Sequence, residues 1–514
     1  MLGILVASIA CMPSRHNLDI PFFTGAVAVT RFAFRSHYLY DIDSVNFALA
    51  IHRFDPRVHQ PHPPGYFLYI CMGRALNSIF HNTNLALVVL SILAGCGTVT
   101  MIYRLALDWF DISTARMAAL VFLFSPLAWF HGTVALTYSV EAFFSSLLGY
   151  LCWKILDNGP QFIVATGVLL GISAGVRPSS LLFLGPLYLF ALFHASPRRR
   201  IIGIAALSST ILAWFLPMIA ASGGFRAYFE ALFSLWQLVP SRDTVFNSSP
   251  ATSIARACTI FLILLLCFGT ACLALFWDAS KPQVVDRRKR VFTAVWCVPA
   301  LSFFTFIFLK FVNSGYLLIV AAPSCLWLGR RIVGWYEGSG WGIKSKLAAM
   351  TLGALANTAI FLASPFYCSY RSVRRFELNL ESVQMALPQV ASSRDAFIVG
   401  FDSHFLGYRH AGYYLPGYLT LEYPAVKLLE GPRIFSMRER DTHLLTHIQT
   451  GSRSRFILFP LPDGDASYRA YIETVKGKLP TGSLQIVRVG SHDFVTGAVS
   501  ELPRLFPGMP SSAQ

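Results

Sequence analysis

Two aspartates with one residue between them, Asp41 and Asp43, are the first candidates for chemistry in this sequence. An ionised carboxylate can take a proton from a hydroxyl group as a general base, and an Asp-x-Asp pair can also coordinate Mg²⁺ or Mn²⁺. The alternative interpretation is that the pair caps a helix or is solvated in a loop. His62 follows, next to a stiff Pro-Pro-Gly corner, and can hydrogen-bond a substrate or Asp43.

Charged residues beside apolar segments form a second group of candidates. Arg177 lies at one end of such a segment, directly before a proline. A guanidinium near a bilayer is costly; it can grip a phosphate through two N–H groups, or it can snorkel to lipid headgroups. Glu141 stands near the end of another apolar segment, where it either orients a substrate in a polar cavity or forms an ion pair that holds the loop. Arg74 and Lys310 are further candidates for phosphate binding.

The composition indicates what kind of protein must position these residues. Of its 514 residues 54% are hydrophobic and only 13% are charged, whereas a soluble chain carries about 25% charged residues. The 43 Phe and 10 Trp exclude a disordered chain. The net charge of +16 is spread through apolar sequence, which argues against a nucleic-acid partner. A polytopic, mainly α-helical membrane protein remains.

About eleven apolar stretches are long enough, or nearly so, to cross a bilayer. They lie near residues 20–34, 85–106, 115–130, 138–155, 162–176, 180–194, 201–221, 254–276, 291–311, 316–328 and 347–364. Three strongly basic loops fall on one side of this arrangement, which the positive-inside rule makes cytoplasmic. The opposite side then receives the first long loop, residues 37–84, together with the ends of the spans that carry Glu141 and Arg177.

The sequence divides into two predicted domains, a membrane domain over 1–365 and a small α/β domain outside the membrane over 366–514. Short β-branched or aromatic runs in the second domain predict strands. These runs are Asp395–Phe401, Leu419–Tyr423, Arg455–Pro460 and Leu484–Val489, and helices are expected over Pro424–Glu430 and Asp441–Thr450. We interpret the nearby Asp402, His404 and His410 as solvated or structural residues.

Five short motifs in the first 200 residues together resemble the GT-C superfamily of integral-membrane glycosyltransferases. The likeness is nearest to the branch of protein O-mannosyltransferases and aminoarabinose transferases, which use polyprenyl-phosphate sugars. The motifs are Asp41-Ile42-Asp43-Ser44, His62-Pro63-Pro64-Gly65-Tyr66, Ser125-Pro126-Leu127-Ala128-Trp129, Thr137-Tyr138-Ser139-Val140-Glu141 and Gly171-Ile172-Ser173-Ala174-Gly175-Val176-Arg177-Pro178. Their order and shared sidedness carry the resemblance more than any one of them.

The resemblance implies an outer-loop aspartate as the catalytic base, a role that falls on Asp43 with Asp41 as the near rival. Many relatives have a second acid where this chain has Asn46. The resemblance therefore does not decide whether Asp41 or Asp43 acts as the base. The candidate substrate-binding residues are His62, Glu141, Arg177, Tyr138, Arg74 and Lys310. Phosphate leaves as a stable anion, so one base suffices. No obligatory metal is expected, although Mg²⁺ or Mn²⁺ is possible.

The leading hypothesis is therefore a membrane glycosyltransferase that moves one sugar from a polyprenyl phosphate to a protein, lipid or glycan acceptor. Its active site is expected on the non-cytoplasmic face, most simply of a bacterial inner membrane. The alternative is a transporter or flippase of a lipid-linked sugar, which predicts charged residues along a path through the bilayer. Here the candidates gather at one end of the spans, which favours the enzyme. Membrane lipids are the other expected partners.

Overall fold

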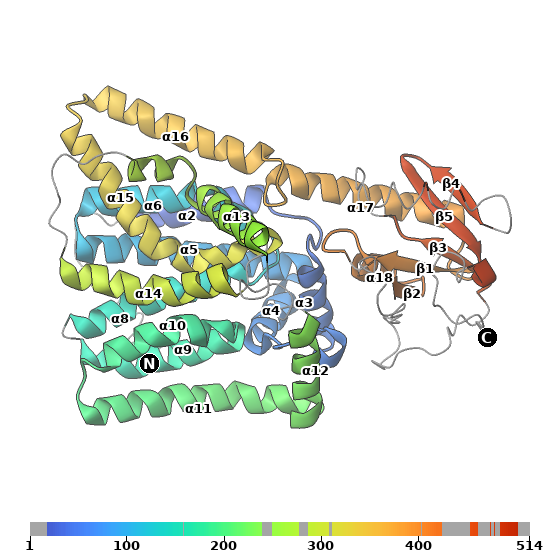
Figure 1. Ribbon diagram of the computed structural model, residues 1–514, viewed down its shortest axis with the longest axis horizontal. Coiled ribbons are helices and arrows are strands. Elements are labelled where there is room, and N and C mark those ends of the chain that lie inside the picture. Colours follow the sequence, from blue (N-terminus) through green and yellow to red (C-terminus); the bar gives the residue numbers. More distant parts are fainter. Residues whose placement is uncertain are drawn as a thin grey trace. The chain divides into compact units, whose positions relative to one another are not determined.

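The structure is a computed structural model, and it divides the chain into two compact units (Figure 1). It describes residues 18–157, 159–238, 249–276, 286–307, 311–401, 403–423, 453–460, 473, 477 and 484–501. The first unit comprises Met1–Arg35 and Pro63–Ser372, and the second comprises Ser36–His62 and Val373–Gln514. The segment that carries the two aspartates therefore belongs to the same unit as the C-terminal part of the chain.

The first unit is built from apolar helices, which satisfy their own backbone hydrogen bonds and can therefore lie in a bilayer. Among the described residues, five helices are long and apolar enough to cross a membrane. They are Thr83–Trp109, Pro197–Ala221, Pro250–Leu275, Asn313–Gly338 and Ile343–Ala363. Four shorter apolar helices accompany them, Phe67–Phe80, Ile112–Leu123, Pro160–Val176 and Ser179–Leu192. The count of about eleven spans stays a prediction.

Helices of the first unit pack side by side in a bundle (Figure 1). The bounds of the main helices are α2 Asp19–Ala33, α4 Phe67–Phe80, α5 Thr83–Trp109, α6 Ile112–Leu123, α7 Pro126–His131, α8 Tyr138–Leu156, α9 Ile163–Val176, α10 Ser179–Leu192, α11 Pro197–Ala221, α12 Phe225–Leu238, α13 Pro250–Phe268, α14 Arg287–Phe306, α15 Ala321–Gly338 and α16 Ile343–Ala363. Short 3₁₀ segments include η4 Gly269–Leu275 and η5 Phe311–Val320. Helix α5 packs on α2 and α8, and α9 packs on α8, α10 and α11.

A break between α6 and α7 interrupts one of the predicted spans, residues 115–130. Helix α6 ends at Leu123, and the Ser125 hydroxyl caps α7 by accepting from the N–H of Ala128 at 3.1 Å. Pro126 occupies the first turn of α7, a position where its missing N–H has no helical partner to lose. The Ser-Pro motif thus begins a new short helix instead of continuing the old one.

The second unit contains a five-stranded sheet in the order β2-β1-β3-β5-β4. The strands are β1 Ala396–Phe401, β2 Thr420–Tyr423, β3 Arg455–Leu458, β4 Gln485–Val489 and β5 His492–Ala498. Strand β1 runs parallel to β2 and β3, while β5 is antiparallel to β3 and β4. The four predicted strand segments are confirmed. Strand β5 was not predicted from the sequence, and the predicted helices Pro424–Glu430 and Asp441–Thr450 lie outside the described residues.

Helices complete the second unit. They are α3 Ile42–His52, α17 Tyr370–Val390 and α18 Tyr408–Tyr414, together with the 3₁₀ turn η1 Pro56–Val58. Along α17 the buried side chains Phe376, Leu380, Val383 and Leu387 recur every three or four residues, which is the spacing of one helix face. Helix α18 packs on α3 and on the sheet. The predicted fold class, a mainly helical membrane domain with a small C-terminal α/β part, is confirmed.

Candidate functional site

Asp41 and Asp43 lie at the start of helix α3 and have different tasks there. Asp41 is the N-cap residue, and its Oδ1 accepts a hydrogen bond from the backbone N–H of Asp43 at 2.8 Å. The capping role considered for the pair therefore applies to Asp41. The Asp43 side chain sits in the first turn and makes no such cap, so its carboxylate is left for other contacts.

The Asp43 carboxylate lies beside an imidazole. Its Oδ1 is 3.2 Å from Nδ1 of His62, and the amide of Asn46 approaches the same oxygen at 3.5 Å. The side chain of Asp43 is 31% exposed and that of His62 is 17% exposed. Both groups are thus partly accessible, as a group that exchanges a proton with a substrate must be. The structure brings together this predicted pair.

A tight turn after α3, closed by Asp55 and Gln60, precedes His62 in the chain. Asp55 and Gln60 pair through their backbones, with Asp55 N–H donating to Gln60 O at 2.6 Å and Gln60 N–H donating to Asp55 O at 3.0 Å. The buried carboxylate of Asp55 accepts from Nε and Nη2 of Arg57 at 2.9 and 3.0 Å, a two-pronged contact that fixes the turn. Farther along, Arg409 of α18 donates to the carbonyl of Val58 at 3.0 Å.

Asp41 is buried, at 7% exposure, and is surrounded by other titratable groups. Nδ1 of His404 lies 3.9 Å from its Oδ2, and the His404 carbonyl accepts from the N–H of Ile42 at 2.9 Å. Burial, and secondly the neighbouring charge of Asp43, raise the pKa of Asp41 to about 7. The carboxyl group of Asp41 is therefore only partly ionised at neutral pH. His404 contacts Asp41, His410 is buried, and Asp402 lies outside the described residues.

In the first unit, Arg177 and Glu141 form a buried ion pair. Nη1 of Arg177 lies 3.4 Å from Oε2 of Glu141, and the two side chains are 4% and 1% exposed. The same Nη1 donates to the hydroxyl of Thr137 at 3.0 Å, and the Ser180 hydroxyl donates to Oε1 of Glu141 at 3.3 Å. Both of these contacts of Arg177 are made by Nη1.

Local sequence explains where Arg177 sits. Helix α9 ends at Val176, and Arg177 adopts an extended conformation (φ −151°, ψ 108°). A residue that precedes proline is driven out of the helical region, so Pro178 ends α9 at this point and begins the turn into α10. Glu141 occupies the first turn of α8, where the positive end of the helix dipole stabilises a carboxylate. Two helix ends thus meet at the ion pair.

Aromatic rings surround the Arg177 guanidinium. Its Cζ lies 4.0 Å from the ring centre of Tyr316, 4.7 Å from that of Tyr138 and 6.0 Å from that of Tyr66. These distances are within the range of cation–π attraction. Tyr138, a predicted substrate-binding residue, lies beside Arg177, and its role in binding stays a prediction. Tyr316 is not among the predicted site residues, because it lies far along the chain at the start of a predicted span, residues 316–328.

A glycine makes room for this aromatic cluster. Gly315 of η5 lies so close to the ring of Tyr138 that a Cβ atom there would meet its Cγ at 2.3 Å. The same Cβ would lie 2.8 Å from Cε1 of His131. The ring centres of His131 and Tyr138 are 4.8 Å apart in an edge-to-face arrangement. Any larger residue at position 315 would therefore displace these rings.

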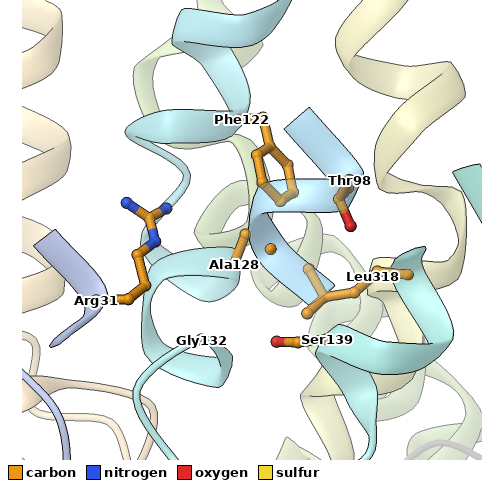
Figure 2. A pocket seen from close by; sticks show the side chains of 9 residues that line it. Arg31, Thr98, Phe122, Ala128, Gly132, Ser139 and Leu318 are labelled. Atoms are coloured by element: carbon orange, nitrogen blue, oxygen red, sulfur yellow. The ribbon is translucent and has the colours of Figure 1, made fainter. Parts of the chain in front are cut away.

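Arg31 spans the break before α7. Its Nη2 donates to the carbonyl of Leu123 at 2.7 Å, and its guanidinium stacks over Trp129 at 5.0 Å. A Cβ at Gly132 would meet the Arg31 stem at 2.7 Å. A small cavity beside it is lined by Arg31, Gly95, Thr98, Phe122, Ala128, Gly132, Ser139, Ala142 and Leu318 (Figure 2). The guanidinium of Arg31 points away from Ser139 and Leu318 (Figure 2). It contacts the residues on both sides of the break, and only the stem of the side chain is directed towards the cavity.

The remaining predicted residues are less informative. Arg74 is exposed on α4, and its phosphate-binding role stays a prediction. Lys310 lies outside the described residues. Over the described ranges, no group of three or more His, Cys, Asp or Glu side chains is placed to hold a metal ion. The predicted site residues thus fall into two groups, Asp41, Asp43 and His62 in the second unit and Tyr138, Glu141 and Arg177 in the first.

Known proteins resemble this chain in sequence and in fold. Residues 43–200 match the family model of the N-terminal domain of the protein O-mannosyl-transferase TMEM260. ArnT from Cupriavidus metallidurans in the apo state has a similar structure, with a TM-score of 0.60 and 12% identity over 93% of this chain and 97% of that chain. ArnT bound to undecaprenyl phosphate gives a TM-score of 0.57 at the same identity and coverage. No curated protein sequence matches the chain.

The archaeal oligosaccharyltransferase of Archaeoglobus fulgidus, in complex with Zn and sulfate, gives a TM-score of 0.44 with 11% identity, over 77% of this chain and 61% of that chain. The two ArnT structures cover nearly the whole of both chains, so they define the fold. The described structure is that of a helical integral-membrane protein with the GT-C fold. The resemblance inferred from the five motifs is confirmed.

Proposed function

We propose that this protein is a membrane glycosyltransferase that moves a sugar from a polyprenyl phosphate to an acceptor hydroxyl outside the cytoplasm, with Asp43 as the general base. The observation that carries the proposal is the partly exposed Asp43 carboxylate, 3.2 Å from His62 at the start of α3. In this reaction the acceptor oxygen bonds to the anomeric carbon, the bond from that carbon to the phosphate oxygen breaks, and Asp43 takes the hydroxyl proton.

The two aspartates differ in their fitness for this role. A base must be ionised and within reach of the hydroxyl. Asp41 is buried, engaged in capping α3, and its pKa is raised to about 7, so it is partly protonated at neutral pH. Asp43 is partly exposed, and the imidazole of His62 lies beside its carboxylate. Asp43 is therefore the base, and Asp41 orients the backbone that carries it.

Arg177 is suited to bind the phosphate of the donor. Its Nη1 is fixed by Thr137 and Glu141, so the guanidinium is held in one orientation before any ligand arrives. A preorganised planar fork binds phosphate oxygens with little loss of entropy. The solved ArnT of the same fold is bound to undecaprenyl phosphate, which supports a polyprenyl phosphate as the donor lipid here.

The role of Asp43 is tested by sugar transfer from undecaprenyl-phosphate mannose to membrane extract. We expect Asp43→Asn to lower the transfer rate about 100- to 10,000-fold while its affinity for undecaprenyl phosphate is retained. Asp41→Asn keeps the cap, since asparagine is an equally good N-cap residue, and retains most of the rate. Equal loss in both variants, or full activity of a folded Asp43→Asn, would contradict the assignment of the base.

The role of Arg177 is tested by donor binding in nanodiscs. We expect Arg177→Gln to weaken undecaprenyl phosphate binding about 10- to 100-fold, because charge-assisted hydrogen bonds to a phosphate are removed. Arg199, an exposed residue of α11, provides the matched control, since Arg199→Gln removes the same charge at an exposed position. An unchanged dissociation constant for Arg177→Gln would exclude phosphate binding by this residue.

We further propose that transfer needs no divalent cation. A lipid monophosphate carries less negative charge than a pyrophosphate donor, and Arg177 already supplies a fixed positive charge. The expected result is full transfer activity after treatment with EDTA, measured with the wild-type protein. A loss of activity that Mg²⁺ or Mn²⁺ restores would assign the Asp-x-Asp pair to metal binding instead.

A further inference from the structure

His131 is a buried polar side chain with no role so far in the proposed reaction. It is the last residue of α7 and is only 2% exposed. Within the described residues, neither Nδ1 nor Nε2 has a hydrogen-bond partner. Leaving both nitrogens of a buried imidazole unpaired is unfavourable, and such groups in native proteins call for an explanation by a ligand or water.

His131 lies beside the group formed by Arg177 and the rings of Tyr66, Tyr138 and Tyr316, here called the Arg177 cluster. Its ring centre lies 4.8 Å from that of Tyr138, whose own ring lies 4.7 Å from Cζ of Arg177. Gly315 adds no side chain on this side, and a Cβ there would approach Cε1 of His131 at 2.8 Å. His131 therefore lies beside one of the tyrosines that contact the Arg177 guanidinium.

A neutral imidazole carries one N–H donor and one acceptor nitrogen on different edges of its ring. A phosphate oxygen that is ionised can only accept, so it satisfies one of these two atoms. A sugar ring offers several hydroxyl groups, each able to donate and to accept, and can satisfy both.

We propose that His131 binds the sugar of the lipid-linked donor through hydrogen bonds to its hydroxyl groups, beside the Arg177 guanidinium that holds the phosphate. This inference rests on the proposed function and assigns to α7 the part of the site that distinguishes a sugar-bearing donor from the bare lipid phosphate. His131 is thus a substrate-binding residue, and the Ser125-Pro126 break is the feature that places it.

The test compares ligands with and without the sugar. The variants are His131→Leu, which has a similar volume and no polar side-chain atoms, and His131→Gln, which retains a donor and an acceptor. Dissociation constants are measured in nanodiscs for undecaprenyl phosphate and for undecaprenyl-phosphate mannose, glucose and 4-amino-4-deoxyarabinose. The control is His194→Leu, because His194 is exposed at the far end of α10 from Arg177.

We expect His131→Leu to weaken binding of the preferred sugar-bearing donor about 10- to 100-fold and to leave that of undecaprenyl phosphate unchanged. His131→Gln should recover part of the affinity. The melting temperature of His131→Leu should not fall, since an unpaired polar group is replaced by an apolar one. A merely structural histidine would give the opposite result, a lower melting temperature and parallel losses of affinity for all ligands.

Three results would overturn the inference. The first is an equal loss of affinity for undecaprenyl phosphate and for the sugar-bearing donors, and the second is no loss for any of them. The third is a wild-type protein that binds none of the three sugar-bearing donors more tightly than undecaprenyl phosphate. The first two leave the proposed transfer reaction intact when the wild-type protein is active, whereas an inactive wild type with every donor counts against the proposed function itself.

Discussion

At the scale of single residues, the protein separates two carboxylates that the sequence presents as a pair. Asp41 is buried and caps α3, whereas Asp43 is partly exposed and lies against His62. Burial penalises the charged form of an acid, and a hydrogen bond from the backbone favours it. For Asp41 burial has the larger effect, so the pKa rises to about 7 despite the cap.

This difference predicts a pH dependence of stability. The pKa of Asp41 is about 7 in the folded protein and about 3.9 in an unfolded chain, so the folded state binds more protons between these values. Its contribution to stability is complete below about pH 4 and is lost as the pH rises through about 7. We therefore expect the melting temperature of the wild type, relative to Asp41→Asn, to fall between pH 5 and pH 8.

The comparison uses thermal unfolding of the purified protein in detergent at several pH values. Asp41→Ala serves as a second variant, because it removes the cap as well as the carboxylate and should be less stable than Asp41→Asn by about 1 kcal/mol at every pH. Parallel melting-temperature curves for the wild type and Asp41→Asn across this range would show that Asp41 does not titrate as inferred.

At the scale of elements, the break between α6 and α7 matters because α7 ends at His131, which lies beside Tyr138 of the Arg177 cluster. Arg31 of α2 holds both sides of the break, through the Leu123 carbonyl at the end of α6 and the face of Trp129 in α7. The Leu123 carbonyl is one of the acceptors that a helix C-terminus leaves without an intrahelical donor. A guanidinium suits this position because it donates in a plane and stacks on an aromatic ring.

Replacing Arg31 by lysine should loosen the break. Lysine keeps the charge but lacks the planar fork, so the contacts to the Leu123 carbonyl and to Trp129 cannot both be kept. We expect a loss of about 1–3 kcal/mol in unfolding free energy, measured as a lower melting temperature, and weaker donor binding. Arg199→Lys on the exposed side of α11 is the control. A stable and fully active Arg31→Lys protein would refute the proposed positioning role.

Gly315 supplies a second prediction at this scale. Gly315→Ala places a Cβ within 2.3 Å of the Tyr138 ring, so either η5 or the ring must move. We expect donor affinity to fall about 10-fold or more, because shifting the Tyr138 ring away from Arg177 should weaken binding by about 1.4 kcal/mol. Gly185→Ala in α10 is the matched control, because a Cβ there meets nothing within 4 Å. Equal donor affinities for the two variants would contradict the close packing of Gly315 on Tyr138.

At the scale of the whole molecule, the segment Ser36–His62 belongs with the C-terminal unit rather than with the helices that flank it in sequence. Within that unit, its backbone is held by the hydroxyl of Tyr414, the carboxylate of Glu377 and the guanidinium of Arg409. The N–H of Leu39 donates to the Tyr414 hydroxyl at 2.7 Å, and the N–H of His37 donates to Glu377 at 2.6 Å. Arg409 donates to the carbonyl of Val58 at 3.0 Å. The C-terminal part thus shapes the loop that carries Asp43.

This arrangement predicts that a change in α18 is felt in the loop. Arg409→Met removes the donor to Val58, so the turn that contains Arg57, together with the neighbouring Arg53, should open more often. We expect trypsin to cleave after these residues about tenfold faster, because removing a hydrogen bond worth about 1.4 kcal/mol shifts the opening equilibrium tenfold. Arg394→Met, at an exposed position of the same unit, is the control. Unchanged cleavage in Arg409→Met would disprove the coupling.

Composition and short motifs were sufficient to predict a mainly helical membrane protein, the small α/β part and the GT-C fold, because apolar length and alternating patterns depend only on local sequence. The same local logic selected Asp43, His62, Glu141 and Arg177 as candidate site residues, and their roles stay predictions. The Pro178 boundary and the Asp41 cap are likewise local, since both depend on neighbouring backbone.

Tertiary structure decided what depends on distant parts of the chain. Burial separated Asp41 from Asp43, the pairing of Asp43 with His62 required the turn closed by Asp55, and Tyr316 reached Arg177 only through helix packing. His131 carries no motif that marks it as a site residue, and its two unpaired nitrogens are visible only once its surroundings are known. The physical reason is that burial and long-range contact set the pKa and hydrogen-bonding state of a side chain, and neither is encoded by sequence spacing alone.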